Sequence, residues 1–216
     1  MGDLPCCSVM GEHESSTRRA GPSQARSVVT SDRILDAATQ VLVEKGLQGF
    51  NTNAVAEAAG LTVGTLYHHF RDKNDLLRVL SERDQAVRTE FVRAHVGEFS
   101  EVTDLDQWVH GMLAALANFR RRQPATLALR RACRAVPELI AAEEAVNDEL
   151  AVLLGKMIRS RYPNVAPRRA TLVGRTVNET VRTMLDSAGE HPRRAAAMRR
   201  ELELMIAAYL RQLEQD

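Results

Sequence analysis

Two adjacent histidines, His68 and His69, stand directly after Tyr67 in the segment LTVGTLYHHFRDKNDLL. An imidazole side chain can bind a metal ion, transfer a proton near neutral pH, or donate a hydrogen bond to an anion. The whole chain contains six histidines, so a neighbouring pair needs an explanation. The residues around the pair decide which of these chemistries applies.

The spacing of the pair disfavours a shared metal ion. Two ligands on one helix face stand three or four positions apart, whereas adjacent side chains diverge by about 100°. Asp72 stands at a ligand spacing from His69, but it is placed to cap the next helix. Catalysis is disfavoured too, because the same short helix has no Ser, Cys or carboxylate to be activated. We therefore expect no metal, no cofactor and no catalytic site.

Helical periodicity places the histidines on the outer side of a short helix. Val63, Leu66 and Phe70 fall on one side, which must be the buried side. The remaining faces carry small or hydrogen-bonding residues: Gly64, Thr65, Tyr67, His68 and His69. No acidic residue stands between Glu57 and Asp72. Such a surface allows close approach and offers hydrogen-bond donors to phosphates or base edges.

The preceding segment, VAEAAGLTVGTLY, has the form of a helix-turn-helix. Ala56 is small where two helices would cross, Gly60 stands in the turn, and Leu61 fills the space between the helices. The second helix of such a motif enters the major groove of DNA. A small-residue corner in an ordinary helical bundle would give a similar pattern. Charge does not separate the two, because the net charge is +1 and residues 26–78 balance six basic against six acidic residues.

Apolar spacing predicts an all-α chain of about nine helices with no strand. Residues 1–28 are rich in Ser, Gly, Pro and charge, so we expect a flexible arm. The first helix is expected to begin at residues 30–32, a Thr-Ser-Asp start signal, and to end at Gly46. Asn51 and Thr62 are expected to cap the second and third helices.

A long fourth helix is expected to start at Lys73, with Asp72 and Asp75 as caps, and to continue past a buried Val87 to Phe99. The other five helices are expected near residues 106–122, 124–134, 137–160, 167–189 and 198–213. The chain of 216 residues has 44% hydrophobic residues, without a secretory signal or a membrane-spanning run. Its three cysteines form no disulfide or metal pattern, so we expect a soluble, cytoplasmic protein.

The segment from Arg33 to Leu77 closely resembles the N-terminal domain of the TetR (tetracycline-repressor-like) family of transcription regulators. The family pattern Gly-x-Leu-Tyr-x-x-Phe-x-x-Lys-x-x-Leu is filled at every position, by Gly64, Leu66, Tyr67, Phe70, Lys73 and Leu76. The resemblance implies a helix-turn-helix DNA-binding domain over residues 29–78, and a bacterial protein associated with the nucleoid when bound to DNA.

The resemblance also implies which residues meet DNA. The recognition-helix positions are Thr62, Val63, Gly64, Thr65, Tyr67, His68 and His69. Lys73 stands where the family places a phosphate-contacting lysine, which agrees with the affinity of a helix N-terminus for anions. Thr52 and Asn53 stand at positions that touch the DNA backbone and sometimes bases, although relatives often have Arg at the position of Asn53.

The family joins this domain to a larger helical one that binds an effector and dimerises, which implies that role for residues 79–216. The last two helices have apolar stripes that can pair with a twin, with Ala170 and Gly174 allowing close approach, or can close the core of a monomer. Candidate effector contacts between the middle helices are Trp108, Met112, Phe119, Leu127, Met157, Asn178 and Arg182. The arginines at 120–122 are expected to form a solvated helix cap rather than an anion site. For Arg130 the sequence leaves both of these interpretations open.

The leading hypothesis is a homodimeric repressor that binds a palindromic DNA operator and is released by an unknown small-molecule effector. One alternative is a helix-turn-helix regulator without small-molecule control. Another is a helical binding module or enzyme, which no nucleophile-base pair, metal cluster or phosphate loop in the sequence supports.

Overall fold

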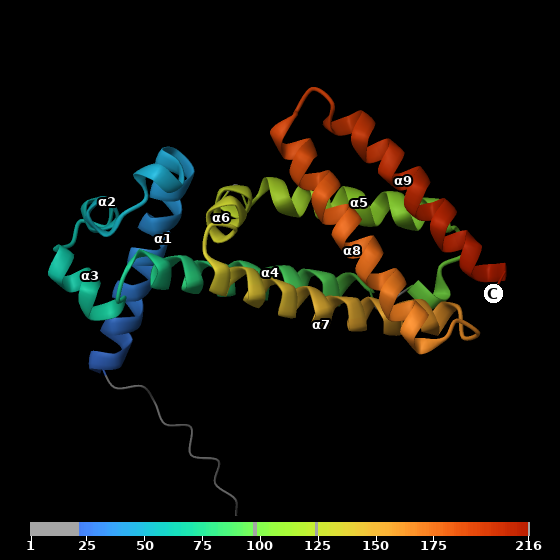
Figure 1. The fold of residues 1–216 in the computed structure, drawn as a ribbon, viewed down its shortest axis with the longest axis horizontal. Helices are drawn as coiled ribbons and strands as arrows, with labels where there is room; N and C mark the ends of the chain where they lie inside the picture. The colour runs from blue at the N-terminus through green and yellow to red at the C-terminus, as the bar shows by residue number, and fades with distance from the viewer. Residues whose placement is uncertain (1–21, 97–98, 124, 216) are drawn as a thin grey trace, which may run out of the picture.

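The computed structural model describes residues 22–96, 99–123 and 125–215. Within these residues the chain forms nine α-helices and two short 3₁₀ helices, and no strand, which confirms the predicted all-α fold. The α-helices are α1 (Pro22–Gly49), α2 (Thr52–Ala58), α3 (Val63–His69), α4 (Lys73–Val96), α5 (Leu105–Arg121), α6 (Ala125–Cys133), α7 (Pro137–Arg161), α8 (Pro167–Glu190) and α9 (Ala195–Gln212). Figure 1 shows α1, α2 and α3 as a small unit at one end of the molecule, joined by α4 to a larger unit built from the later helices.

Glycines and caps end and start the helices of the small unit where the sequence predicts. Gly46 adopts a positive φ of 62° and interrupts α1, and Gly60 adopts a φ of 61° in the turn before α3. The side chain of Asn51 accepts a hydrogen bond from the backbone N–H of Ala54, which caps α2. The turn between α2 and α3 is therefore fixed by local sequence.

The predicted start of the first helix is wrong. Helix α1 begins at Pro22 and runs without a break through residues 30–32. Proline suits a first helical turn, because its missing N–H would have no partner there. The hydroxyl of Thr30 donates to the carbonyl of Arg26, one turn earlier, instead of capping a new helix. The part of the predicted flexible arm before residue 22 lies outside the described residues.

The long helix α4 starts at Lys73 as predicted, and Asp72 accepts hydrogen bonds from the N–H groups of Asn74 and Asp75. The expected course beyond this point is wrong in two details. Val87 is 42% exposed, because it does not lie on the buried stripe of the helix. Phe99 belongs to a short 3₁₀ helix at residues 99–101 and packs against Trp108, with ring centroids 4.4 Å apart.

The buried side chains form two hydrophobic cores. One core joins α1, α2, α3 and the start of α4 to α6, from which Leu129, Ala132 and Cys133 contribute. The second core lies among α5, α8, α9 and the C-terminal end of α7. Helices α4 and α7 run side by side between the two regions. Helix α6 therefore packs on the small unit although it lies more than forty residues later in the chain.

Helices α7 and α8 approach each other closely because glycine stands at the contact. A Cβ atom added to Gly174 would lie 2.8 Å from the carbonyl oxygen of Ala151 and 2.9 Å from Cβ of Leu154. Ala170 is fully buried in the same chain. Ala170 and Gly174 were predicted to allow close approach of a second protomer. Both are instead buried within this chain, where Gly174 contacts α7.

Candidate nucleic-acid interface

Helix α3 is held against the first core by one face and exposes the rest. Leu66 is fully buried, Phe70 is 4% exposed, and Val63 is half-buried against the same core. Thr62 caps the helix by accepting a hydrogen bond from the N–H of Thr65 at 3.1 Å. The apolar packing and the Thr62 cap together fix the orientation of the outward side chains.

A hydrogen bond joins the outer surfaces of α2 and α3. The Thr52 hydroxyl lies 3.1 Å from the phenol oxygen of Tyr67, and the Tyr67 side chain is 53% exposed. Asn53, the next residue of α2, is exposed beside it. The two helices of the motif therefore present one continuous polar surface.

The outer surface of α3 is open at Gly64. A Cβ atom added to Gly64 would meet only the Thr62 hydroxyl, at 3.9 Å. The rings of His68 and His69 lie edge to face, with centroids 5.6 Å apart and an interplanar angle of 87°. In the described part of the chain, no group of three or more His, Cys, Asp or Glu side chains gathers at metal-binding distance. A rigid body such as a DNA backbone can approach α3 closely at Gly64.

The N-terminus of α4 borders this surface. Lys73, its first residue, is exposed. Arg71, which is not among the predicted residues, has a side chain that is 86% exposed and lies 4.0 Å from the carboxylate of Asp75. The sequence signal that could have identified Arg71 is its position two residues before Lys73, in the short segment between α3 and α4. We call the ten predicted residues on this side the recognition surface: Thr52, Asn53, Thr62, Val63, Gly64, Thr65, Tyr67, His68, His69 and Lys73.

The seven predicted effector residues differ in their surroundings. Trp108 and Met157 pack against the second core, and the ring of Phe119 packs against Phe91 at a centroid distance of 4.5 Å. Met112 and Leu127 are half-buried. A hollow of about 350 Å³ is lined by residues of α1, α4 and α6 and the segment before α6, and by none of the seven.

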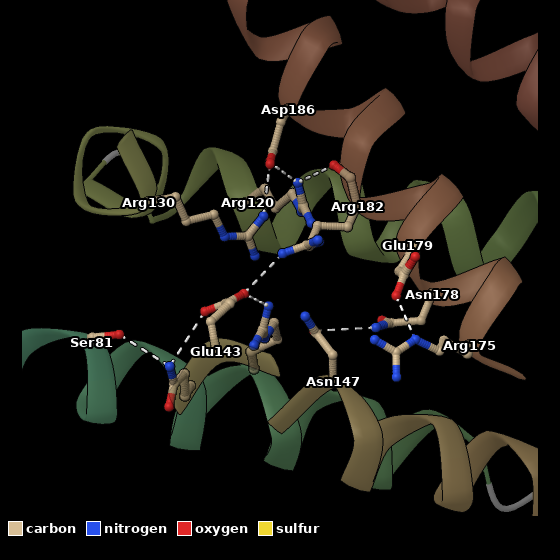
Figure 2. A network of polar contacts seen from close by, with 12 residues as sticks. Ser81, Arg120, Arg130, Glu143, Asn147, Arg175, Asn178, Glu179, Arg182 and Asp186 are labelled. Atoms are coloured by element: carbon tan, nitrogen blue, oxygen red, sulfur yellow. Dashed lines mark hydrogen bonds and ion pairs between the residues drawn. The ribbon is translucent and has the colours of Figure 1, made fainter. Parts of the chain in front are cut away.

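Asn178 and Arg182 lie in a polar region between α7 and α8. The Asn178 amide donates to the side-chain oxygen of Asn147 at 3.4 Å. Arg182 donates to Glu143 at 3.1 Å. Figure 2 shows both side chains pointing from α8 toward α7. They border a larger network of charged side chains that was not predicted from the sequence.

We call the charged core of this network the charged layer. Its members come from α4, α5, α6, α7 and α8: Arg88, Arg120, Arg130, Glu143, Arg182 and Asp186. Glu143 accepts hydrogen bonds from Arg88 at 3.0 Å and from Arg182 at 3.1 Å. Asp186 binds Arg120, and it accepts hydrogen bonds from Arg130 at 2.9 Å. The layer thus ties five helices together.

The expectation of a solvated cap at Arg120 is wrong. Its side chain is 15% exposed and binds Asp186, because it lies against α8, whereas Arg121 and Arg122 are exposed. Burial and the neighbouring charge of Arg130 lower the pKa of Arg120 to about 10. Burial also lowers the pKa of Arg88. Burial tends to raise the pKa of Glu143, but the charges of Arg88, Arg130 and Arg182 outweigh it, so that pKa is lowered.

The fold and the recognition surface define a helix-turn-helix DNA-binding protein. Residues 34–80 match the family model described as bacterial regulatory proteins, tetR family. Residues 104–210 match the model for the tetracyclin repressor-like C-terminal domain. The chain therefore belongs to the TetR family of transcriptional regulators, which excludes the alternative of an enzyme.

Individual relatives agree with this family. The HTH-type transcriptional repressor BepR of Brucella suis is 27% identical over 169 residues, which cover 76% of this chain and 78% of BepR. The Salmonella enterica GusR structure has a TM-score of 0.65 at 23% identity, covering 85% of this chain and 96% of that one. Bacillus subtilis FadR in complex with stearoyl-CoA has a TM-score of 0.63 at 15% identity, covering 82% and 97%. Within the described residues, no helix has the length and apolar character needed to cross a membrane.

Proposed function

We propose that this protein is a homodimeric, sequence-specific DNA-binding repressor that a small-molecule effector releases from its operator. The observation that carries the proposal is the recognition surface, where α3 is anchored by Leu66 and turns its polar groups outward beside Lys73. The similarity to a relative named as a repressor supports repression. The similarity in fold to a FadR structure with bound stearoyl-CoA supports an effector. From the DNA-binding role we also infer a cytoplasmic location in a bacterium.

Each part of the recognition surface has a proposed role. The proposed DNA contacts are Thr52, Asn53, Thr62, Val63, Gly64, Thr65, Tyr67, His68, His69 and Lys73. Lys73 and the N-terminus of α4 would bind one phosphate together. The hydroxyl and imidazole groups of α3 would donate to base edges or phosphates, and Gly64 would let the backbone approach.

We further propose that residues 29–78 bind DNA and residues 79–216 bind the effector and dimerise through α8 and α9. Large apolar side chains remain exposed on these two helices: Leu172, Leu204, Met205 and Tyr209. An apolar surface of this kind favours a two-fold pair, which would match a palindromic operator. The substitution Leu204→Glu is expected to convert the dimer to a monomer in sedimentation analysis. Val43→Glu, an exposed valine on α1, is the control.

The seven predicted effector contacts remain proposals of unequal support. Asn178 and Arg182 border the charged layer, where buried polar groups from several helices converge. Trp108, Met112, Phe119, Leu127 and Met157 would supply apolar surface around it. An effector there would shift the population between two arrangements of the helices, because it binds one of them better.

The proposal is tested by selecting bound fragments from random DNA. Wild type is expected to enrich a palindrome, and failure to enrich any sequence would overturn the proposal. Tyr67→Ala and Lys73→Ala are expected to weaken binding by about 10- to 100-fold each, the range for one charged or directional contact. Lys156→Ala removes an exposed lysine from α7, and it should bind DNA as wild type does.

A further inference from the structure

The charged layer contains more basic than acidic groups. Arg88 and Arg182 bind Glu143, and Arg120 and Arg130 bind Asp186. The next acid toward Arg88 is Asp84, which accepts a hydrogen bond from the Thr126 hydroxyl at 2.6 Å. Even with Asp84 counted, the guanidinium groups outnumber the carboxylates by one. Buried charges are costly unless they are paired, so this imbalance needs a compensating anion.

The unpaired donors are concentrated on Arg88 and Arg130. The Arg88 side chain is 8% exposed, and its Nη1 atom donates to Glu143. Its other two nitrogens, Nε and Nη2, are buried and have no hydrogen-bond acceptor among the described residues. The Nε atom of Arg130, whose side chain is 9% exposed, lacks an acceptor in the same way. Buried donors in native proteins are nearly always paired, so three such donors in one layer point to a ligand.

The two free nitrogens of Arg88 define the shape of that ligand. Nε and Nη2 form one edge of the guanidinium plane, and their N–H bonds point in parallel. This edge matches two oxygens of one carboxylate or phosphate group. A cation would be repelled by the four arginines, and a neutral ligand would leave the charge imbalance in place.

We propose that Arg88 and Arg130 bind an oxyanion, the carboxylate or phosphate group of the effector. The regulatory part of this inference rests on the proposed function, whereas the binding part does not. Arg88 stands on α4, the same continuous helix that begins at Lys73 beside the recognition surface. Arg130 stands on α6, which packs on the core of the small unit. An oxyanion bound by their free nitrogens joins α4 to α6 and so favours one packing of these two helices against α7.

Thermal unfolding of the full chain tests the site without knowledge of the natural effector. The probes are benzoate and inorganic phosphate, with sodium chloride at equal ionic strength and neutral benzamide as controls. A probe at ten times its dissociation constant is expected to raise the midpoint by about 3–6 °C. The relative size of the benzoate and phosphate responses separates a carboxylate site from a phosphate site. Phosphate also stabilises proteins by exclusion from their surfaces, so only the difference between variants counts.

The variants Arg88→Lys and Arg130→Lys retain the positive charge and remove the guanidinium donors. Both are expected to lose the benzoate and phosphate shifts beyond the chloride control. Arg175→Gln removes an exposed arginine of α8 that pairs with Glu179 outside the layer, and it should respond as wild type does. If one lysine variant does not fold, the other still tests the site.

Two results overturn the inference. One is a wild-type midpoint that rises no more with benzoate and phosphate than with chloride and benzamide. The other is a lysine variant that responds as strongly as wild type. DNA selection on the same samples separates this failure from failure of the proposed function. A protein that enriches a palindrome without an oxyanion response refutes only the inference, whereas an Arg88-dependent response without DNA selection refutes only the repressor.

Discussion

The recognition surface and the charged layer place hydrogen-bonding side chains in opposite surroundings. On the recognition surface, Tyr67 is 53% exposed, and water can satisfy its hydroxyl before DNA arrives. In the charged layer, the side chains of Arg88 and Arg130 are only 8% and 9% exposed, so only other side chains or a ligand can satisfy them. The first region can therefore change its binding with little effect on folding. In the second region, binding and stability depend on the same groups.

The strongest test of this difference is removal of the carboxylate shared by two arginines. Glu143→Gln leaves Arg88 and Arg182 without their common charged partner. Breaking a buried ion pair by removing one partner costs about 3–5 kcal/mol. Urea unfolding at neutral pH is expected to report a loss in free energy of this size.

The matched control is Glu144→Gln, one position along α7. Glu144 is exposed, so its replacement should leave the urea midpoint close to that of wild type. Equal effects of the two substitutions would mean that the layer contributes no more than a surface charge.

Glu143→Gln also tests how the stability of the protein depends on pH. The folded-state pKa of Glu143 lies below its usual value of 4.5, because the surrounding arginines favour the charged form despite burial. Its contribution is therefore fully present above the unfolded-state pKa and is lost as the pH falls through the lower folded-state value. The stability difference between wild type and Glu143→Gln should shrink as the pH falls below 4.5. A constant difference down to pH 3 would contradict the lowered pKa.

On the recognition surface, a large effect on folding requires a change beneath the polar groups. Leu66 is fully buried under α3, and Leu66→Ala leaves a cavity that costs about 2–5 kcal/mol. DNA binding should weaken together with stability in unfolding and anisotropy measurements, because α3 loses its anchor. Tyr67→Ala is the opposite control, with weaker DNA binding and a nearly unchanged unfolding midpoint.

The recognition surface could be predicted because its determinants are local. The apolar positions Leu66 and Phe70 fix which side of α3 is buried, and Asn51, Thr62 and Asp72 fix where the three helices begin. These signals act within a few residues of the side chains that they orient. The same reasoning failed at α1, because Thr30 can cap a helix or donate within one.

The charged layer could not be predicted in the same way, because it joins residues from Arg88 to Asp186 on five helices. An arginine in a helical sequence looks the same whether it meets water or another helix, and Arg120 was misassigned for this reason. One signal was present in α4. Ser81, Gln85 and Arg88 stand at helical spacing and are all buried, so the inner stripe continues as polar residues where Val87 was expected to be buried.

A smaller effect is expected from the cap of α2. The Asn51 side chain accepts from the N–H of Ala54 at 2.9 Å, and replacing such a cap by alanine costs about 1 kcal/mol. Asn51→Asp retains an acceptor and should restore the midpoint in urea unfolding. A full loss with aspartate would indicate that the amide, which also donates to the carbonyl of Gly49, matters more than the cap.

The smallest effect is expected where an arginine forms ion pairs in water. Arg175 binds Asp148 and Glu179, yet its side chain is 40% exposed. Exposed pairs contribute little, because water screens the charges and the long side chains lose freedom. Arg175→Gln should leave the unfolding midpoint within experimental error of wild type, whereas Arg130→Gln should lower it measurably, since Asp186 then loses a buried partner. Equal shifts would show that ion pairing alone, independent of burial, sets the contribution of an arginine in this protein.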